Sequence, residues 1–309
     1  MNKSTTKPKI ICILGMHRSG TSMLTRILNL CGLSLGKSEE MFTPTYHNQK
    51  GHWENNRFME INIEIIRFFS NKISDWNTRI TFPENWQKIQ KIKNIKKRAI
   101  KLVKDFDSRY QSWGWKDPRN CITLPFWQEI LGNRLKYIIV LRQPIDIANS
   151  LLKRNNYPVT QGLLLWDKYM TNAITFTNNL SKYFIVSEQL FSNRKKEIMS
   201  LIKFINDKNI TYNQKTDQKI KNFISNDHWH NQQYKPILNT DQNEITKLIS
   251  QLYSQTINEL DTLYQKTINN KNITINSQNN KINTIEKSKY YQIYNRILIL
   301  KHKLKKLIQ

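Results

Sequence analysis

The sequence has few of the residues that mark disulfide-rich, loop-dominated or membrane-embedded proteins. Its 309 residues include only three cysteines, eight glycines and eight prolines. The cysteines form neither a CxxC pair nor a metal-ligand spacing, so we expect a reducing compartment and no metal. The first apolar run, Ile10 to Leu14, is too short for a signal sequence or a membrane span. We therefore expect a cytoplasmic protein.

Acidic residues are also scarce. The chain has 23 Asp and Glu against 49 Lys and Arg, which gives a formal net charge of +26. Such an excess attracts polyanions or anionic membrane surfaces. The chain is also rich in Asn, Ile and Lys, so part of the excess is compositional. Two interpretations stay open, an anionic partner surface and a compositional bias, and we expect no specific nucleic-acid partner.

Short apolar runs alternate with segments of helical periodicity. Strands are expected at residues 10–14, 113–116, 136–142 and 183–187. A helix is expected after the loop that follows the first strand, as far as Leu30 and Cys31, and further helices are expected at residues 58–69, 88–106, 160–180 and 188–205. This alternation predicts a parallel sheet with right-handed crossovers. The expected fold is α/β, a P-loop-like three-layer α/β/α arrangement with a helical extension at the C-terminus.

The composition predicts four segments along the chain. They are a flexible N-terminus at 1–8, an α/β domain at 9–265, an Asn-rich linker at 266–286 and a basic amphipathic helix at 287–309. The last helix is compatible with self-association, with peripheral membrane contact or with simple packing. A second basic amphipathic helix is expected at 88–106, either as a solvated charged face or as a surface that guides an acidic acceptor.

The loop between the first strand and the first helix is typical of a phosphate-binding loop. Gly15 and Gly20 have the spacing of a nucleotide P-loop, where backbone N–H groups and a helix N-terminus converge on phosphate oxygens. Thr21 replaces the lysine of an ATP-binding loop, and Arg18 is the cation inside the loop. Other polar side chains of the loop are His17, Ser19 and Ser22. This set favours a small anionic group that needs no metal, and a Gly- and Ser-rich turn without a ligand is the alternative.

A second strand-to-helix junction follows the sequence KYIIVL. ATP-using P-loop proteins commonly end this strand in an acid that helps to hold Mg²⁺, but here the next residue is Arg142. Pro144 starts the following helix, and Ser150 lies within it. Arg142 and Ser150 together favour a second phosphate site. The alternatives are an interdomain salt bridge for Arg142 and a surface hydroxyl for Ser150.

Four ordered motifs resemble segments of the sulfotransferases that use 3′-phosphoadenosine-5′-phosphosulfate (PAPS). They are GMHRSGTS, KGHWEN, WGWKDPR and VLRQPIDIANS, and the resemblance covers roughly residues 9–205. It implies PAPS as the cofactor, with the first motif at the 5′-phosphosulfate and the last at the 3′-phosphate. It also implies transfer of the sulfuryl group to a hydroxyl, and a saccharide or glycolipid is the acceptor that bacterial members suggest.

The resemblance also implies catalytic roles. Arg18 and Lys116 would neutralise the charge that develops as the S–O bond breaks. The acceptor hydroxyl needs a base, and the resemblance implies Glu54, with His52 as the alternative. Small-molecule sulfotransferases place a histidine two residues after the lysine, where this chain has Pro118.

Two other functions remain as alternatives at this point. A P-loop kinase would require Mg²⁺ and ATP, and a non-catalytic polyanion-binding protein would depend on the net charge alone. Asp117 is expected to have a structural role, either by orienting its loop or by binding a lysine or arginine.

Overall fold

The computed structural model describes residues 9–46, 48, 50–70, 76–77, 80, 82–224 and 251. The chain divides into two compact units. Among the described residues, the first unit comprises 9–142 and 168–224, and the second comprises 143–167 and 251. The expected flexible N-terminus, Asn-rich linker and C-terminal basic helix lie outside the described residues, so the segment boundaries stay predictions.

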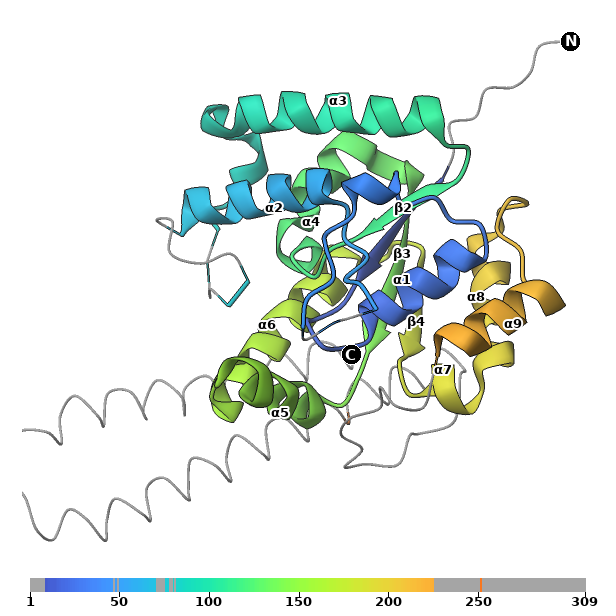
Figure 1. The fold of residues 1–309 in the computed structure, drawn as a ribbon. Coiled ribbons are helices and arrows are strands. Elements are labelled where there is room, and N and C mark those ends of the chain that lie inside the picture. The colour runs from blue at the N-terminus through green and yellow to red at the C-terminus, as the bar shows by residue number, and fades with distance from the viewer. Residues whose placement is uncertain are drawn as a thin grey trace, which may run out of the picture. The chain divides into compact units, whose positions relative to one another are not determined.

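A parallel sheet forms the centre of the first unit (Figure 1). Its strands are β1 (Ile10–Leu14), β2 (Trp113–Lys116), β3 (Leu135–Leu141) and β4 (Lys182–Val186). Their order across the sheet is β2-β1-β3-β4, and every pairing is parallel. The carboxyl ends of all four strands therefore lie at one edge. The four expected strands are confirmed, with bounds that differ by at most one residue.

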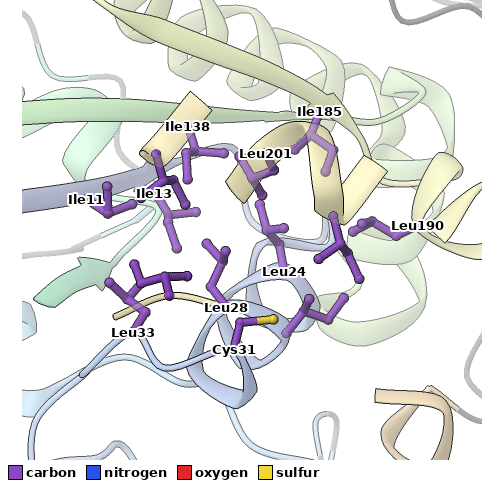
Figure 2. Packing of buried hydrophobic residues seen from close by; sticks show 14 of the residues in the cluster. Ile11, Ile13, Leu24, Leu28, Cys31, Leu33, Ile138, Ile185, Leu190 and Leu201 are labelled. Carbon is purple, nitrogen blue, oxygen red and sulfur yellow. The ribbon is translucent and has the colours of Figure 1, made fainter. Parts of the chain in front are cut away.

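One face of the sheet is covered by α1 (Thr21–Leu30), α8 (Arg194–Ile205) and α9 (Gln214–Phe223). Alternate residues of a strand point to the same face, and here they are aliphatic. They pack against leucines and isoleucines of the three helices (Figure 2). Strand and helix residues of this cluster include Ile11, Ile13, Ile138, Ile185, Leu24, Leu28 and Leu201. This packing fixes α1 directly after the expected phosphate-binding loop.

The other face is covered by α2 (Asn56–Phe69), α3 (Lys93–Arg109) and α4 (Asn120–Leu131). Its core is aromatic where the first core is aliphatic. The ring of Phe58 stacks on Trp115 at 5.2 Å between centroids and also contacts Trp127 at 5.3 Å. Helices on both faces make the three layers, so the expected α/β/α fold with a central parallel sheet is confirmed. The expected C-terminal helical extension lies outside the described residues.

The second unit contains α5 (Pro144–Asn155) and the first part of α6 (Val159–Phe176). Pro144 occupies the first turn of α5, where its missing N–H needs no partner. A Cβ atom on Gly162 would lie 2.9 Å from the Cα of Ala148. Glycine at this position therefore allows α5 and α6 to approach each other closely.

Three of the expected helices differ from the expectation by more than two residues. The helix expected at 160–180 is α6, which ends at Phe176. The helix expected at 88–106 starts at Lys93 and ends at Arg109, because residues 86–88 and 90–92 form short 3₁₀ turns. The helix expected at 188–205 is divided into α7 (Gln189–Ser192) and α8. Asn193 causes this division, since its φ of −131° and ψ of 33° are not helical. Among the helices of the described residues, none is long and apolar enough to cross a membrane.

Candidate functional site

The loop between β1 and α1 has the backbone of an anion-binding loop. Gly15, Arg18 and Gly20 all have positive φ angles, of 152°, 70° and 90°. A Cβ on Gly15 would lie 2.7 Å from Cγ2 of Thr21, so only glycine fits where the loop closes on itself. Gly20 caps α1 without a side-chain hydrogen bond, and the first turn contains no acid. The N–H groups at this helix start, with the helix dipole, suit an anion.

The residue that follows β3 contacts the loop that follows β1. Arg142, which follows β3, donates from Nη1 to the backbone oxygen of Arg18 at 2.8 Å. This bond joins the carboxyl ends of β1 and β3, which are neighbours in the sheet. Ser150 lies on α5 in the second unit and is buried. Its role in the 3′-phosphate site stays a prediction.

Lys116 brings together two more of the expected residues. It is the last residue of β2, where it pairs with Ile13 of β1, and its side chain is almost fully buried. Its Nζ donates to Oε1 of Glu54 at 2.5 Å and to Oγ of Ser22 at 3.0 Å. A lysine, a carboxylate and a hydroxyl of the first turn of α1 that are far apart in the sequence therefore form one contact group.

The segment before α2 holds Glu54 in position. The backbone oxygen of Glu54 accepts from the N–H of Phe42 at 2.8 Å, and the next residue, Asn55, caps α2 through the N–H of Arg57. Trp53 has a positive φ of 60°, and the guanidinium of Arg26 on α1 lies 4.4 Å from the centre of its ring. The backbone on each side of Glu54 is therefore fixed by named contacts.

Glu54 has one paired oxygen and one available oxygen. It is only 6% exposed, and within the described part of the chain Oε2 has no hydrogen-bond partner. Burial raises the pKa of Glu54, while the neighbouring Lys116 opposes this shift. A carboxyl group with a raised pKa and an oxygen without a partner accepts a proton more readily than an ordinary glutamate.

Asp117 has the structural role that was expected. Its Oδ1 accepts from the backbone N–H and from Nη1 of Arg119, both at 3.0 Å, and its Oδ2 accepts from Nδ2 of Asn62 at 2.9 Å. Asn62 in turn accepts from Thr123 and from the indole N–H of Trp127. This buried network connects α2 and α4 to the turn that follows Lys116.

The two expected histidines lie in different surroundings. Nε2 of His52 lies 2.8 Å from Oγ1 of Thr45, and its ring lies 5.0 Å from that of Phe42. Of the two candidate bases, Glu54 is the one with a hydrogen bond to the buried Lys116. His17 packs between aromatic rings, with centroid distances of 5.2 Å to Trp76 and 5.8 Å to Tyr169. Its cofactor-binding role stays a prediction.

Comparison with known proteins gives matches among solved structures. No protein-family model and no curated protein matches the chain. The sulfotransferase domain of the Synechococcus PCC 7002 olefin synthase is 18% identical, with a TM-score of 0.43, over 72% of this chain and 79% of that chain. The sulfotransferase domain of the curacin biosynthetic pathway is 20% identical, with a TM-score of 0.39, over 68% and 76%. Sulfotransferase STF9 of Mycobacterium avium is 10% identical, with a TM-score of 0.45, over 82% and 77%.

Sequence reasoning missed the residues at the carboxyl end of β4. A Cβ on Gly20 would lie 2.9 Å from Cβ of Ser187, so this serine borders the loop between β1 and α1. The N–H of Ser187 donates to the oxygen of Leu141, and its hydroxyl lies 3.0 Å from Oε2 of Glu188. The signal was present, because a serine and a glutamate directly follow β4 at the edge where the strands that precede Arg142 and the β1–α1 loop also end.

A metal site would need a group of three or more His, Cys, Asp or Glu side chains. Among the residues that the structure describes, no such group is found. The cysteines of that part, Cys12, Cys31 and Cys121, are buried and form no disulfide. Cys121 instead accepts a hydrogen bond from the N–H of Gly15 at 3.2 Å. This bond connects α4 to the start of the loop between β1 and α1.

Proposed function

We propose that the protein is a sulfotransferase that moves the sulfuryl group of PAPS to an acceptor hydroxyl, on a carbohydrate or glycoconjugate, and releases the 3′,5′-bisphosphate (PAP). The contact group of Lys116, Glu54 and Ser22 beside the phosphate-binding loop is the observation that carries this proposal. It places a buried cation and a carboxyl group with a raised pKa at the end of the loop that would hold the donor.

The loop suits the phosphate groups of the donor. The positive φ angles of Gly15, Arg18 and Gly20 and the start of α1 without a side-chain cap form a cradle for an anion. Arg142 contacts this loop directly, and we assign it to the 3′-phosphate. We assign Ser150 to the same phosphate on the basis of the sequence motif alone.

PAPS supplies an activated sulfuryl group when it is bound. Glu54 takes the proton from the acceptor hydroxyl as the new O–S bond forms. Lys116 neutralises the negative charge on the oxygen whose bond to sulfur breaks, and Arg18 acts on the same charge from the loop. The proton then passes from Glu54 to solvent.

The ion pair between Glu54 and Lys116 links these two tasks. While Glu54 is ionised, its charge holds the ammonium group at 2.5 Å. Protonation removes that charge, so the attraction that keeps Lys116 on Glu54 weakens at the moment when negative charge grows on the leaving oxygen. We expect Lys116 to turn toward that oxygen as Glu54 receives the proton.

Calorimetry with PAP in a buffer containing EDTA tests the proposal, together with transfer of labelled sulfate from PAPS to a panel of hydroxyl acceptors. We expect metal-independent PAP binding that Arg18→Ala weakens by at least about 10-fold, as for the loss of a charge-assisted contact. Binding of ATP only in the presence of Mg²⁺, with no binding of PAP, would instead indicate the kinase alternative.

A further inference from the structure

The outer face of α3 carries a row of lysines. Residues 93, 97, 101 and 104 are separated by four, four and three positions, so they lie on one face of the helix. All four side chains are exposed. With a rise of about 1.5 Å per residue, this lysine row is on the order of 16 Å long. We refer to Lys93, Lys97, Lys101 and Lys104 as the lysine row.

The acids near the lysine row are bound to other cations. Asp105 pairs with Arg57 at 2.5 Å and with Arg109 at 2.7 Å, and Arg57 holds the pKa of Asp105 below its ordinary value. Asp107 pairs with Arg134. On the neighbouring helices, Glu64 pairs with Arg98 and Glu129 with Lys96. Among the described residues, no acid forms an ion pair with a lysine of the row, so its charge is not neutralised.

The chemistry of the exposed face limits the kind of partner. The apolar face of α3 is buried in the core through Ile95, Leu102 and Phe106. On the exposed face, Ile100 is the large apolar side chain, and it is 37% exposed. A helix that inserts into a membrane surface needs a broad apolar face, and binding of single-stranded nucleic acid uses aromatic rings that stack on bases. Four lysines in a line with neither feature fit a linear polymer that is contacted through its charges.

The lysine row is connected to the proposed base through a short chain of contacts. Lys104 is the neighbour of Asp105, whose carboxylate binds Arg57. Arg57 lies in the first turn of α2, just after Asn55 and Glu54. A polymer on the lysine row therefore lies on a helix that is fixed to the segment carrying Glu54.

We propose that the lysine row binds an acidic polysaccharide, one with carboxylate or sulfate groups along the chain, and that this polymer is the acceptor. This inference rests on the proposed sulfotransferase function. Each exposed lysine contributes little alone, but four in a row raise the local concentration of a polyanion and extend its contact beyond the reacting hydroxyl.

A quadruple variant, Lys93→Gln, Lys97→Gln, Lys101→Gln and Lys104→Gln, tests the proposal. The matched control changes four exposed lysines elsewhere to Gln and thereby removes the same net charge: Lys195, Lys203, Lys208 and Lys219. The probe is a heparin oligosaccharide, and its dissociation constant is measured by calorimetry over a range of salt concentrations. The far-UV spectrum and the melting temperature establish that both variants are folded.

We expect the row variant to bind heparin at least about 10-fold more weakly, with a salt slope smaller by roughly 3, since each polyanion contact contributes somewhat less than one unit. The control variant should lose less than about 3-fold. With a polymeric acidic acceptor, the row variant should raise KM and leave kcat unchanged. Equal losses in both variants, or no loss in either, would overturn the proposal.

Two further probes separate this inference from its alternatives and from the proposed function. Tighter row-dependent binding to duplex DNA, or to vesicles of phosphatidylserine, than to heparin would overturn the polysaccharide assignment. Unchanged PAP affinity in the row variant supports a separate acceptor surface. If the wild-type protein binds heparin through the row but does not bind PAP, the proposed sulfotransferase function fails while the binding surface stands.

Discussion

Lysine occurs in two opposite settings in this protein, and their difference shows what fixes the position of a charge. Lys116 is buried at the end of β2, where it is bound to Glu54 and Ser22. Lys97 stands exposed on α3 among three other lysines and no paired acid within the described residues. A buried charge must be paired because its desolvation is costly, and its position is then fixed by its partners. An exposed charge keeps its water and acts only with its neighbours.

Removal of the buried cation should have the largest effect. Lys116→Met leaves Glu54 buried without its partner, so we expect a loss of about 3 to 5 kcal/mol in the free energy of unfolding. Turnover should fall by at least about 100-fold because the leaving oxygen loses its cation. Guanidinium denaturation and sulfate transfer measure the two effects.

The control for Lys116→Met is the same substitution at an exposed lysine. Lys97→Met should alter the free energy of unfolding by less than about 0.5 kcal/mol. The double variant Glu54→Gln with Lys116→Met removes both charges and should recover part of the lost stability. A double variant that is less stable than Lys116→Met would contradict the pairing argument.

Replacement of the proposed base should reduce turnover with little effect on binding. Glu54→Gln keeps the shape of the side chain but cannot accept the proton, so we expect turnover to fall by about 10²- to 10⁴-fold while PAP affinity stays within a few fold. His52→Gln is the matched control and should keep most of the activity. Wild-type turnover in Glu54→Gln would transfer the base role to His52 or another group.

The pH dependence of stability and of turnover tests the carboxyl group of Glu54 while Lys116 stays in place. The folded state raises the pKa of Glu54 above its ordinary value, so its stabilising contribution is present at low pH and is lost as the pH rises through the raised pKa. The stability of the wild type relative to Glu54→Gln should therefore decrease as the pH rises above the ordinary range of a glutamate. On the acid side of the profile, kcat/KM should rise with pH at values above the ordinary pKa range of a glutamate, because the base must be ionised to act.

The contact between Gly20 and Ser187 should give the smallest effect of this series. Ser187→Val adds volume beside the loop, so we expect PAP affinity to fall by about 10-fold and stability by roughly 1 to 3 kcal/mol. Ser187→Ala removes only the hydroxyl and should bind PAP within about 3-fold of the wild type. If both variants bind PAP equally weakly, the loss of the hydroxyl lowers the affinity and the added volume beside Gly20 does not.

Local patterns were sufficient to predict the sheet and its helices. The runs IICIL and LKYIIVL are apolar strands buried on both faces, and the aliphatic spacing of α1 identifies its buried face. Helix ends were less predictable, because the division at Asn193 and the 3₁₀ turns before α3 depend on backbone angles that no periodicity records.

The roles of the predicted site residues stay predictions, and the contacts among these residues could not be read from the sequence. The motifs single out Arg18, Lys116 and Glu54, yet the bond between Glu54 and Lys116 joins positions 62 residues apart. The pairing of β1 with β2 places Lys116 beside the end of β1, and the hydrophobic pattern of each strand does not specify its neighbour. Ser187 was missed because its importance lies in the space beside Gly20, which only the folded chain defines.

The contact between Arg26 and Trp53 provides the protein with an optical reporter of its own. The guanidinium of Arg26 lies over the indole ring of Trp53, and Trp53 directly precedes Glu54 in the chain. Indole emission responds to a nearby charge, so a ligand that moves the start of α1 or the Glu54 segment changes the light that Trp53 emits. The difference between the wild type and Trp53→Phe isolates this signal from the other tryptophans, and it allows loading of the loop to be followed in real time without a label.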